Sequence, residues 1–175
     1  AAPTRVAPEV AAAMVAQLNS VDSYANPSAI SHQPGQAAAA VVAEARASIA
    51  AELGCESDEV IFTSGATEAN NLALRGVALA HAAHGRHLVV SAIEHPAVLA
   101  CCDALEREGY AITRVAPNRQ GWIEPEAVAF ALRPDTLLIS LMHINNETGM
   151  MQPATEVAEL AAEAGEQFHV EPAQA

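Results

Sequence analysis

The sequence predicts an α/β fold, with a mostly parallel sheet and helices on both of its faces. Two observations lead to this prediction. Short aliphatic runs alternate with alanine-rich segments of helical spacing, and polar clusters follow most of the aliphatic runs. Strands separated by helices need crossover connections, which make neighbouring strands parallel. We expect five strands, at residues 60–63, 88–91, 111–115, 136–142 and 167–170.

The first part of the chain predicts two helices and a long loop. Residues 9–18 carry apolar side chains at helical spacing after Pro8. Residues 19–34 are rich in Ser, Asn and Pro, which indicates a loop. Residues 35–53 are rich in alanine and indicate a second helix, which Gly54 ends as a C-cap.

From residue 60 onward, a strand and a helix follow each other repeatedly. Proline favours the start of a helix and glycine favours its end, so Pro96 and Gly109 delimit one of these helices. We expect helices at residues 67–83, 96–108, 125–132 and 153–164. No internal repeat stands out.

Composition excludes several function classes. The 175 residues include 8 Lys+Arg and 21 Asp+Glu, a formal net charge of −13, which argues against a nucleic-acid or anionic-membrane partner. All eight cations are arginines, so the chain offers no side-chain amine for a Schiff base. Its three cysteines match neither a disulfide framework nor a zinc site. Without a signal peptide or an apolar span, we expect a cytoplasmic protein, and the first residues suggest that an N-terminal portion is missing.

Ligands of parallel sheets bind beyond the carboxyl ends of the strands, where this sequence places its polar clusters. Residues 64–67 lead from a strand into a helix, where free N–H groups could bind a phosphate; an ordinary N-cap is the alternative. His95, at the start of a helix, could stack on a flat ring or move a proton, or could be a structural histidine.

Two later clusters have similar alternatives. Asn145, Asn146 and Glu147 could orient a polar ligand, or could form a turn whose asparagines bond their own backbone. Glu171, near Gln174, could neutralise a protonated ring nitrogen, or could be one more surface acid. Cys101 and Cys102 are expected to be buried, unreactive thiols, because no cation is adjacent in the sequence.

Together these clusters resemble the cysteine desulfurases of the NifS/IscS type, which are class-V aminotransferases with the fold-type I architecture. The resemblance rests on Phe-Thr-Ser-Gly-Ala-Thr-Glu-Ala-Asn-Asn at 62–71, Ser-Ala-Ile-Glu-His-Pro at 91–96 and Met-His-Ile-Asn-Asn-Glu-Thr-Gly at 142–149. Tyr-Ala-Asn-Pro-Ser at 24–28 is similar to an early loop of the family. The order and the spacing of these motifs match, so the resemblance covers essentially the whole chain.

The resemblance implies a pyridoxal 5'-phosphate enzyme that removes sulfur from L-cysteine, leaving L-alanine and a persulfide on an enzyme cysteine. The sulfur would supply iron–sulfur clusters or thiocofactors through an acceptor protein, and homodimers are the family's rule. By position, the resemblance implies that Ala66 and Thr67 bind the cofactor phosphate, and that His95 stacks on the pyridine ring and assists proton transfer. Asn146 would contact the hydroxyl side of the cofactor and the substrate carboxylate. Glu171 would pair with the ring nitrogen, and Gln174 would bond the phenolic oxygen.

The resemblance also implies a domain assignment. Residues 1–20 would lead into the large cofactor-binding domain, and residues 21–175 would form part of it, ending before the Schiff-base lysine. The family's persulfide-forming cysteine also has no counterpart here, so this chain alone would be inactive. A family sheet of seven strands would leave an open edge here, which we expect a partner, a dimer or further chain to cover.

Four positions depart from the family's pattern. Glu171 stands where the family has an aspartate and Pro172 where it has a small residue, while Pro3 replaces a threonine and Ala25 a glycine. These changes leave two alternatives to an active desulfurase. One is a catalytically inactive binding or scaffold subunit. The other is a different class-V enzyme, such as a selenocysteine lyase or an aminotransferase.

Overall fold

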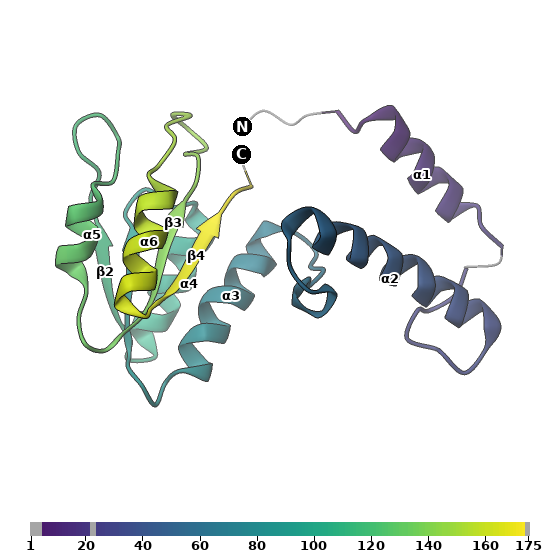
Figure 1. The fold of residues 1–175 in the computed structure, drawn as a ribbon, viewed down its shortest axis with the longest axis horizontal. Coiled ribbons are helices and arrows are strands. Elements are labelled where there is room, and N and C mark those ends of the chain that lie inside the picture. The colour runs from purple at the N-terminus through teal and green to yellow at the C-terminus, as the bar shows by residue number, and fades with distance from the viewer. Residues whose placement is uncertain (1–4, 22–23, 174–175) are drawn as a thin grey trace. The chain divides into compact units, whose positions relative to one another are not determined.

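The computed structural model describes residues 5–21 and 24–173 of the chain (Figure 1). These residues form two compact units, one within residues 2–62 and the other within residues 63–175. The second unit contains the whole sheet and the helices that cover it. Each unit is described separately below.

The unit within residues 2–62 is helical. Helix α1, Pro8–Leu18, has a proline in its first turn and buries none of its residues. Helix α2, Gln33–Leu53, ends at Gly54, whose φ of 68° is the left-handed conformation that favours glycine at a C-cap. A short 3-10 helix, η1, follows at Ser57–Glu59. The two long helices therefore match the predicted segments to within two residues at each end.

The prediction of a strand at residues 60–63 is wrong. Val60 has an extended backbone, but none of these four residues pairs with a strand among the described residues. The side chain of Arg46 donates a hydrogen bond to the carbonyl oxygen of Val60, and its guanidinium lies over the Phe62 ring. The β-branched and aromatic sequence favours an extended backbone, but a strand also needs a hydrogen-bonded neighbour.

The unit within residues 63–175 contains a four-stranded parallel sheet in the order β2-β1-β3-β4. Its strands are β1 (His87–Ser91), β2 (Ala111–Val115), β3 (Thr136–Met142) and β4 (Gln167–Glu171). The two central strands, β1 and β3, are buried along their whole length. Their near-continuous apolar sequence is typical of strands covered on both faces.

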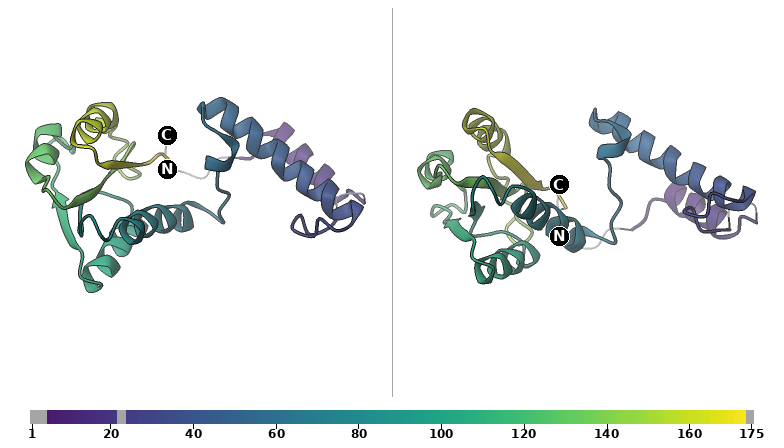
Figure 2. Two further views of the ribbon diagram at one scale, coloured as in Figure 1. Left: turned by 60° about the horizontal axis from the view of Figure 1, so that its bottom comes forward. Right: turned by 90° about the horizontal axis from the view of Figure 1, so that it is seen from below.

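Helices cover both faces of this sheet, as predicted. Helices α3 (Ala66–Ala80) and α4 (Pro96–Arg107) pack on one face around a core that includes Leu74 and Leu105. Helices α5 (Pro125–Ala131) and α6 (Ala154–Ala164) pack on the other around a core that includes Ile123 and Val157. Figure 2 shows the teal helices on one side of the strands and the green and yellow helices on the other. No helix among the described residues combines the length and apolar character that a membrane span requires.

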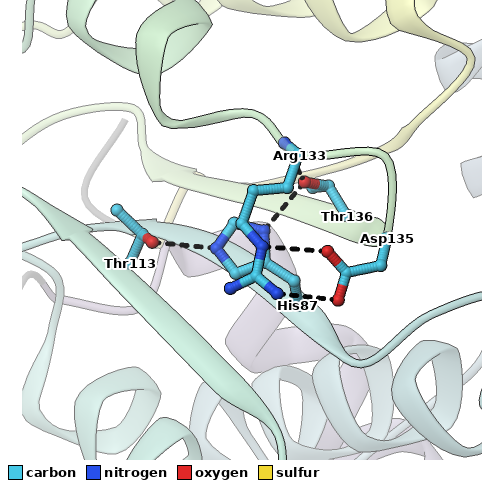
Figure 3. A network of polar contacts seen from close by, with 5 residues as sticks. All are labelled: His87, Thr113, Arg133, Asp135 and Thr136. Carbon is cyan, nitrogen blue, oxygen red and sulfur yellow. Dashed lines mark hydrogen bonds and ion pairs between the residues drawn. The ribbon is translucent and has the colours of Figure 1, made fainter.

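The amino edge of the sheet carries a closed polar network around His87 (Figure 3). His87 Nδ1 lies 2.8 Å from Thr136 Oγ1, and His87 Nε2 lies 2.8 Å from Thr113 Oγ1. Arg133 and Asp135 form an ion pair beside this ring, with two N···O distances of 2.9 Å. These contacts join the starts of β1 and β3 to the neighbouring strand β2.

Candidate functional site

The opposite, carboxyl edge of the sheet brings three of the predicted clusters together. Strands β1, β3 and β4 are consecutive neighbours and all parallel, so their ends at Ser91, Met142 and Glu171 share one edge. His95 and Asn146 lie in the loops that follow β1 and β3, and Glu171 is the last residue of β4. This arrangement is the one in which parallel sheets bind ligands.

His95 is the N-cap residue of α4. Its Nδ1 accepts a hydrogen bond of 3.1 Å from the Ala97 backbone N–H, and the side chain is half-buried. A neutral ring that accepts at Nδ1 carries its proton on Nε2. The cap thus fixes both the tautomer and the orientation of the imidazole.

Helix α3 begins at Ala66, and both Ala66 and Thr67 are exposed. The first N–H groups of a helix have no acceptor within it, and the N-cap residue here, Gly65, has no side chain to accept from them. Glu68 Oε2 instead accepts a hydrogen bond of 2.6 Å from the Ser64 N–H, which lowers the pKa of that carboxyl. The start of α3 is therefore able to donate to an anion such as a phosphate.

The loop after β3 is organised by Asn145, which is buried, with 7% of its surface exposed. Its Oδ1 accepts from the backbone N–H groups of Glu147 and Thr148, at 3.1 and 2.9 Å. Its Nδ2 donates to the Ile93 carbonyl oxygen at 3.1 Å. For Asn145 the predicted turn is confirmed, and the turn leaves the half-buried Asn146 on the wall of a hollow of about 320 Å³.

Two carboxyl groups are buried where β3 and β4 end. Glu171 closes β4 with 4% of its surface exposed, and its Oε1 accepts a 3.0 Å bond from the Ala173 N–H. Glu94, also 4% exposed, accepts a 2.7 Å bond at Oε1 from the Met142 N–H. Glu171 is therefore not the surface acid of the alternative interpretation.

Glu94 is a residue of this edge that sequence reasoning missed. Its pKa is raised to about 8, mainly by burial and to a smaller extent by the nearby Glu171, while the Met142 N–H bond acts in the opposite direction. Its Oε2 has no hydrogen-bond partner among the described residues. Its position between Ile93 and His95, just beyond an apolar strand, was the signal for a role at this edge.

The remaining predicted positions divide into two groups. Gln174 and Pro3 lie outside the described residues. Cys101 and Cys102 are buried in α4 as predicted, and burial raises the pKa of both thiols, that of Cys102 to about 12. Such thiols stay protonated and unreactive at neutral pH. The described residues hold no cluster of three or more His, Cys, Asp or Glu able to bind a metal.

The chain is similar in sequence and in fold to members of one protein family. The family described as Aminotransferase class-V matches residues 1–175. Cysteine desulfurase IscS of Dictyoglomus turgidum (strain DSM 6724 / Z-1310) is 44% identical over 153 residues, covering 87% of this chain and 39% of that protein. Cysteine desulfurase IscS of Anaeromyxobacter sp. (strain K) is 43% identical over 173 residues, covering 99% of this chain and 42% of that protein.

A solved structure described as SspA in complex with cysteine is 40% identical, with a TM-score of 0.90, and covers 98% of this chain and 49% of that one. The predicted α/β architecture is thereby confirmed as part of the large domain of a fold-type I enzyme. The chain spans about two fifths of the length of the curated relatives it matches. It belongs to the class-V aminotransferase family and is a homologue of the NifS/IscS-type cysteine desulfurases within it.

Proposed function

We propose that the protein carrying this chain is a pyridoxal-phosphate-dependent cysteine desulfurase, which converts L-cysteine to L-alanine and leaves a persulfide on an enzyme cysteine. One observation carries the proposal. His95 and Asn146 follow two adjacent parallel strands and Glu171 ends a third, all at one edge, in a chain 43% identical over 173 residues to a cysteine desulfurase. Residues 21–175 would then belong to the large cofactor-binding domain, with residues 1–20 leading into it.

The residues at this edge suit the cofactor, on which this enzyme family depends. The uncapped start of α3, at Ala66 and Thr67, would bind the phosphate. The buried carboxyl of Glu171 would pair with the protonated ring nitrogen, and Gln174 would bond the phenolic oxygen. When bound, the cofactor supplies an electron sink for the bonds at the substrate's α-carbon.

The chain's own side chains would orient the substrate and move protons. His95, held at Nδ1 by the Ala97 N–H, would lie against the cofactor ring and exchange a proton at Nε2. Asn146 would hold the substrate carboxylate through its side-chain amide. The amine that anchors the cofactor must come from outside these residues, because all eight cations of the chain are arginines. The persulfide-forming cysteine would also come from outside. Cys101 and Cys102 are buried, and Cys55, which is half-buried, does not match the family's position for that cysteine.

The proposal includes partners in the cytoplasm. A homodimer or a complementing chain would complete the site, and a sulfur-acceptor protein would carry the sulfur to iron–sulfur clusters or thiocofactors. The net charge of −13 argues against direct contact with nucleic acid or with an anionic membrane.

The second candidate is an inactive binding or scaffold subunit, and Glu171 favours it. A glutamate carries its charge about one bond length further than the family's aspartate, so the cofactor ring must shift to keep the pair. Pro172 removes a backbone donor directly after it.

The test uses the protein expressed from its own gene. The protein is incubated with pyridoxal phosphate, dialysed to remove unbound cofactor, and then given L-cysteine with a thiol reductant. We expect cofactor to be retained, and sulfide and alanine to form in equal amounts. Loss of all cofactor on dialysis would contradict the proposal. Retained cofactor without alanine would favour the scaffold, and alanine formed from selenocysteine alone would favour a selenocysteine lyase.

A further inference from the structure

Glu94 takes the place of a missing strand residue beside the end of β3. The His143 N–H donates to the Glu171 carbonyl oxygen at 3.0 Å, so it points toward β4. Successive N–H groups of a strand point in opposite directions, so the Met142 N–H points toward β1, which has already ended at Ser91. Glu94 Oε1 accepts from this N–H at 2.7 Å and so satisfies a buried donor.

A second contact closes the same gap. Asn145 Nδ2 donates to the Ile93 carbonyl oxygen at 3.1 Å, next to the Glu94–Met142 contact. Together the two bonds tie the loop that carries His95 to the loop that carries Asn146. Both are buried or half-buried contacts, so water competes for them poorly.

The two titratable groups whose charge acts on Glu94 are both acids. They are Glu171 on β4 and Cys102 on α4, and the Cys102 thiol is protonated at neutral pH. No arginine of the described chain forms an ion pair with either buried carboxyl. Glu171 lies directly opposite Met142 in the β3–β4 register, and Glu94 binds the N–H of that same Met142. Two buried carboxylates so placed disfavour a second charge.

We infer that Glu94 is a positioning residue: a neutral carboxyl that fixes the ends of β1 and β3 without adding a negative charge beside Glu171. The Ala173 N–H donates to Glu171 Oε1, whereas Glu94 Oε2 has no such donor among the described residues. The neutrality of Glu94 rests on burial and contacts alone. Its consequence for the cofactor, a single charge facing the ring nitrogen, rests on the proposed function.

The inference distinguishes two substitutions. Glu94→Gln keeps an oxygen to accept from the Met142 N–H and resembles a protonated carboxyl in shape and charge. Glu94→Ala leaves that N–H buried without an acceptor and opens a void. Glu163→Gln, at an exposed position in α6, is the matched control because it removes one carboxyl from the surface.

The experiment uses the protein expressed from its own gene, without added cofactor, and two readouts. Infrared difference spectra at pH 7 should contain the carbonyl stretch of a protonated carboxylic acid in the wild type and in Glu163→Gln, and not in Glu94→Gln. Thermal unfolding at pH 7 should show Glu94→Ala several degrees below the wild type and Glu94→Gln at or above it. A band that survives in Glu94→Gln, or equal destabilisation by Gln and Ala, would overturn the inference.

A pH series sharpens the test. Because the pKa of Glu94 is raised to about 8 in the folded protein, its contribution to stability is full below its ordinary value of 4.5 and is lost as the pH rises toward 8. The unfolding temperature of the wild type should therefore fall relative to that of Glu94→Gln between pH 5 and pH 8 and stay level above pH 8. The infrared band should fade around pH 8, where Glu94 itself ionises in the folded protein. A constant difference would also overturn the inference. None of these readouts needs the cofactor, so failure here is distinct from failure of the proposed function.

Discussion

The two edges of the sheet differ in how completely their buried polar groups are paired. At the amino edge, both ring nitrogens of His87 lie 2.8 Å from threonine hydroxyls. At the carboxyl edge, Glu94 Oε2 has no partner. One turn into α3, Asn70 Nδ2 has none either, and these two are the only buried side-chain nitrogen or oxygen atoms without a partner among the described residues.

This difference separates a stabilising edge from a binding edge. A buried polar group without a partner costs about 1–3 kcal/mol, so a fold keeps such groups where they serve another purpose. The amino edge has no such groups among its described residues, and its contacts join three strands. The carboxyl edge combines incomplete pairing, an uncapped helix start and the hollow beside Asn146. The comparison therefore predicts that substitutions at the first edge change stability alone, whereas those at the second change ligand affinity as well.

The largest expected effect is on stability, from His87→Ala. The substitution leaves the hydroxyls of Thr113 and Thr136 without the ring and opens a buried void, so the free energy of unfolding should fall by about 3 kcal/mol. Urea denaturation measures it, with the exposed His84→Ala as control. Affinity for pyridoxal phosphate should be unchanged in the folded variant. A marked loss of affinity would break the distinction between the edges.

Glu171→Ala should have the next largest effect, now on affinity. Removing a buried charge that pairs with a cationic ring nitrogen forfeits about 1.5–3 kcal/mol, which corresponds to a loss of cofactor affinity of roughly 50-fold. Equilibrium dialysis measures this, and the exposed Glu163→Ala should bind as the wild type does. Equal affinities for Glu171→Ala and its control would show that Glu171 makes no contribution to cofactor binding.

On the proposed function, His95→Ala should weaken cofactor binding by about tenfold, because the ring that would lie against the cofactor is lost. It should also cost about 1 kcal/mol of stability, because the N-cap bond to the Ala97 N–H is lost. His95→Asn separates the two effects: asparagine caps a helix well but has no aromatic ring. We expect Asn to restore the unfolding temperature and not the affinity. If Asn restored both, the ring would have no role in binding.

Much of the fold was predictable because its signals are local. Pro96 begins α4 and Gly54 follows the end of α2, so these helix bounds were predicted within one or two residues. The buried strand β3 was predicted at its observed bounds, Thr136–Met142, from its apolar run. The strand expected at 60–63 does not form, and its absence could not be predicted, because pairing depends on residues far away in the sequence.

The candidate site was predictable to the extent that it follows strands. His95, Asn146 and Glu171 could be assigned to one edge from the predicted topology alone. For Glu94 the position beyond a strand was predictable but the burial was not, because in a chain with 21 acids nothing local distinguishes a buried carboxyl from a surface one. Its burial depends on β3 and β4, some 50 and 75 residues away, and only the fold brings these strands to it.

The smallest expected effect is the response of the amino edge to acid, which is opposite in direction to the response expected of Glu94. Burial, helped by Arg133 and opposed by Asp135, lowers the pKa of His87 from 6.5, so the native state holds this ring neutral. Below pH 6.5 the unfolded chain binds the extra proton, so the contribution of His87 is full above that pH and is lost as the pH falls below it.

Burial lowers the pKa of His169 in the same direction, so the measurement compares the wild type with His87→Gln, which lacks the titration of His87. Between pH 7 and pH 5 the unfolding temperature of the wild type should fall by a few degrees relative to that variant, whereas parallel curves would assign the acid response to His169 or to other groups. The two edges would then respond to pH in opposite directions, because burial favours the neutral form of both groups. His87 loses its contribution as the pH falls below 6.5, and Glu94 loses its contribution as the pH rises from 4.5 toward 8.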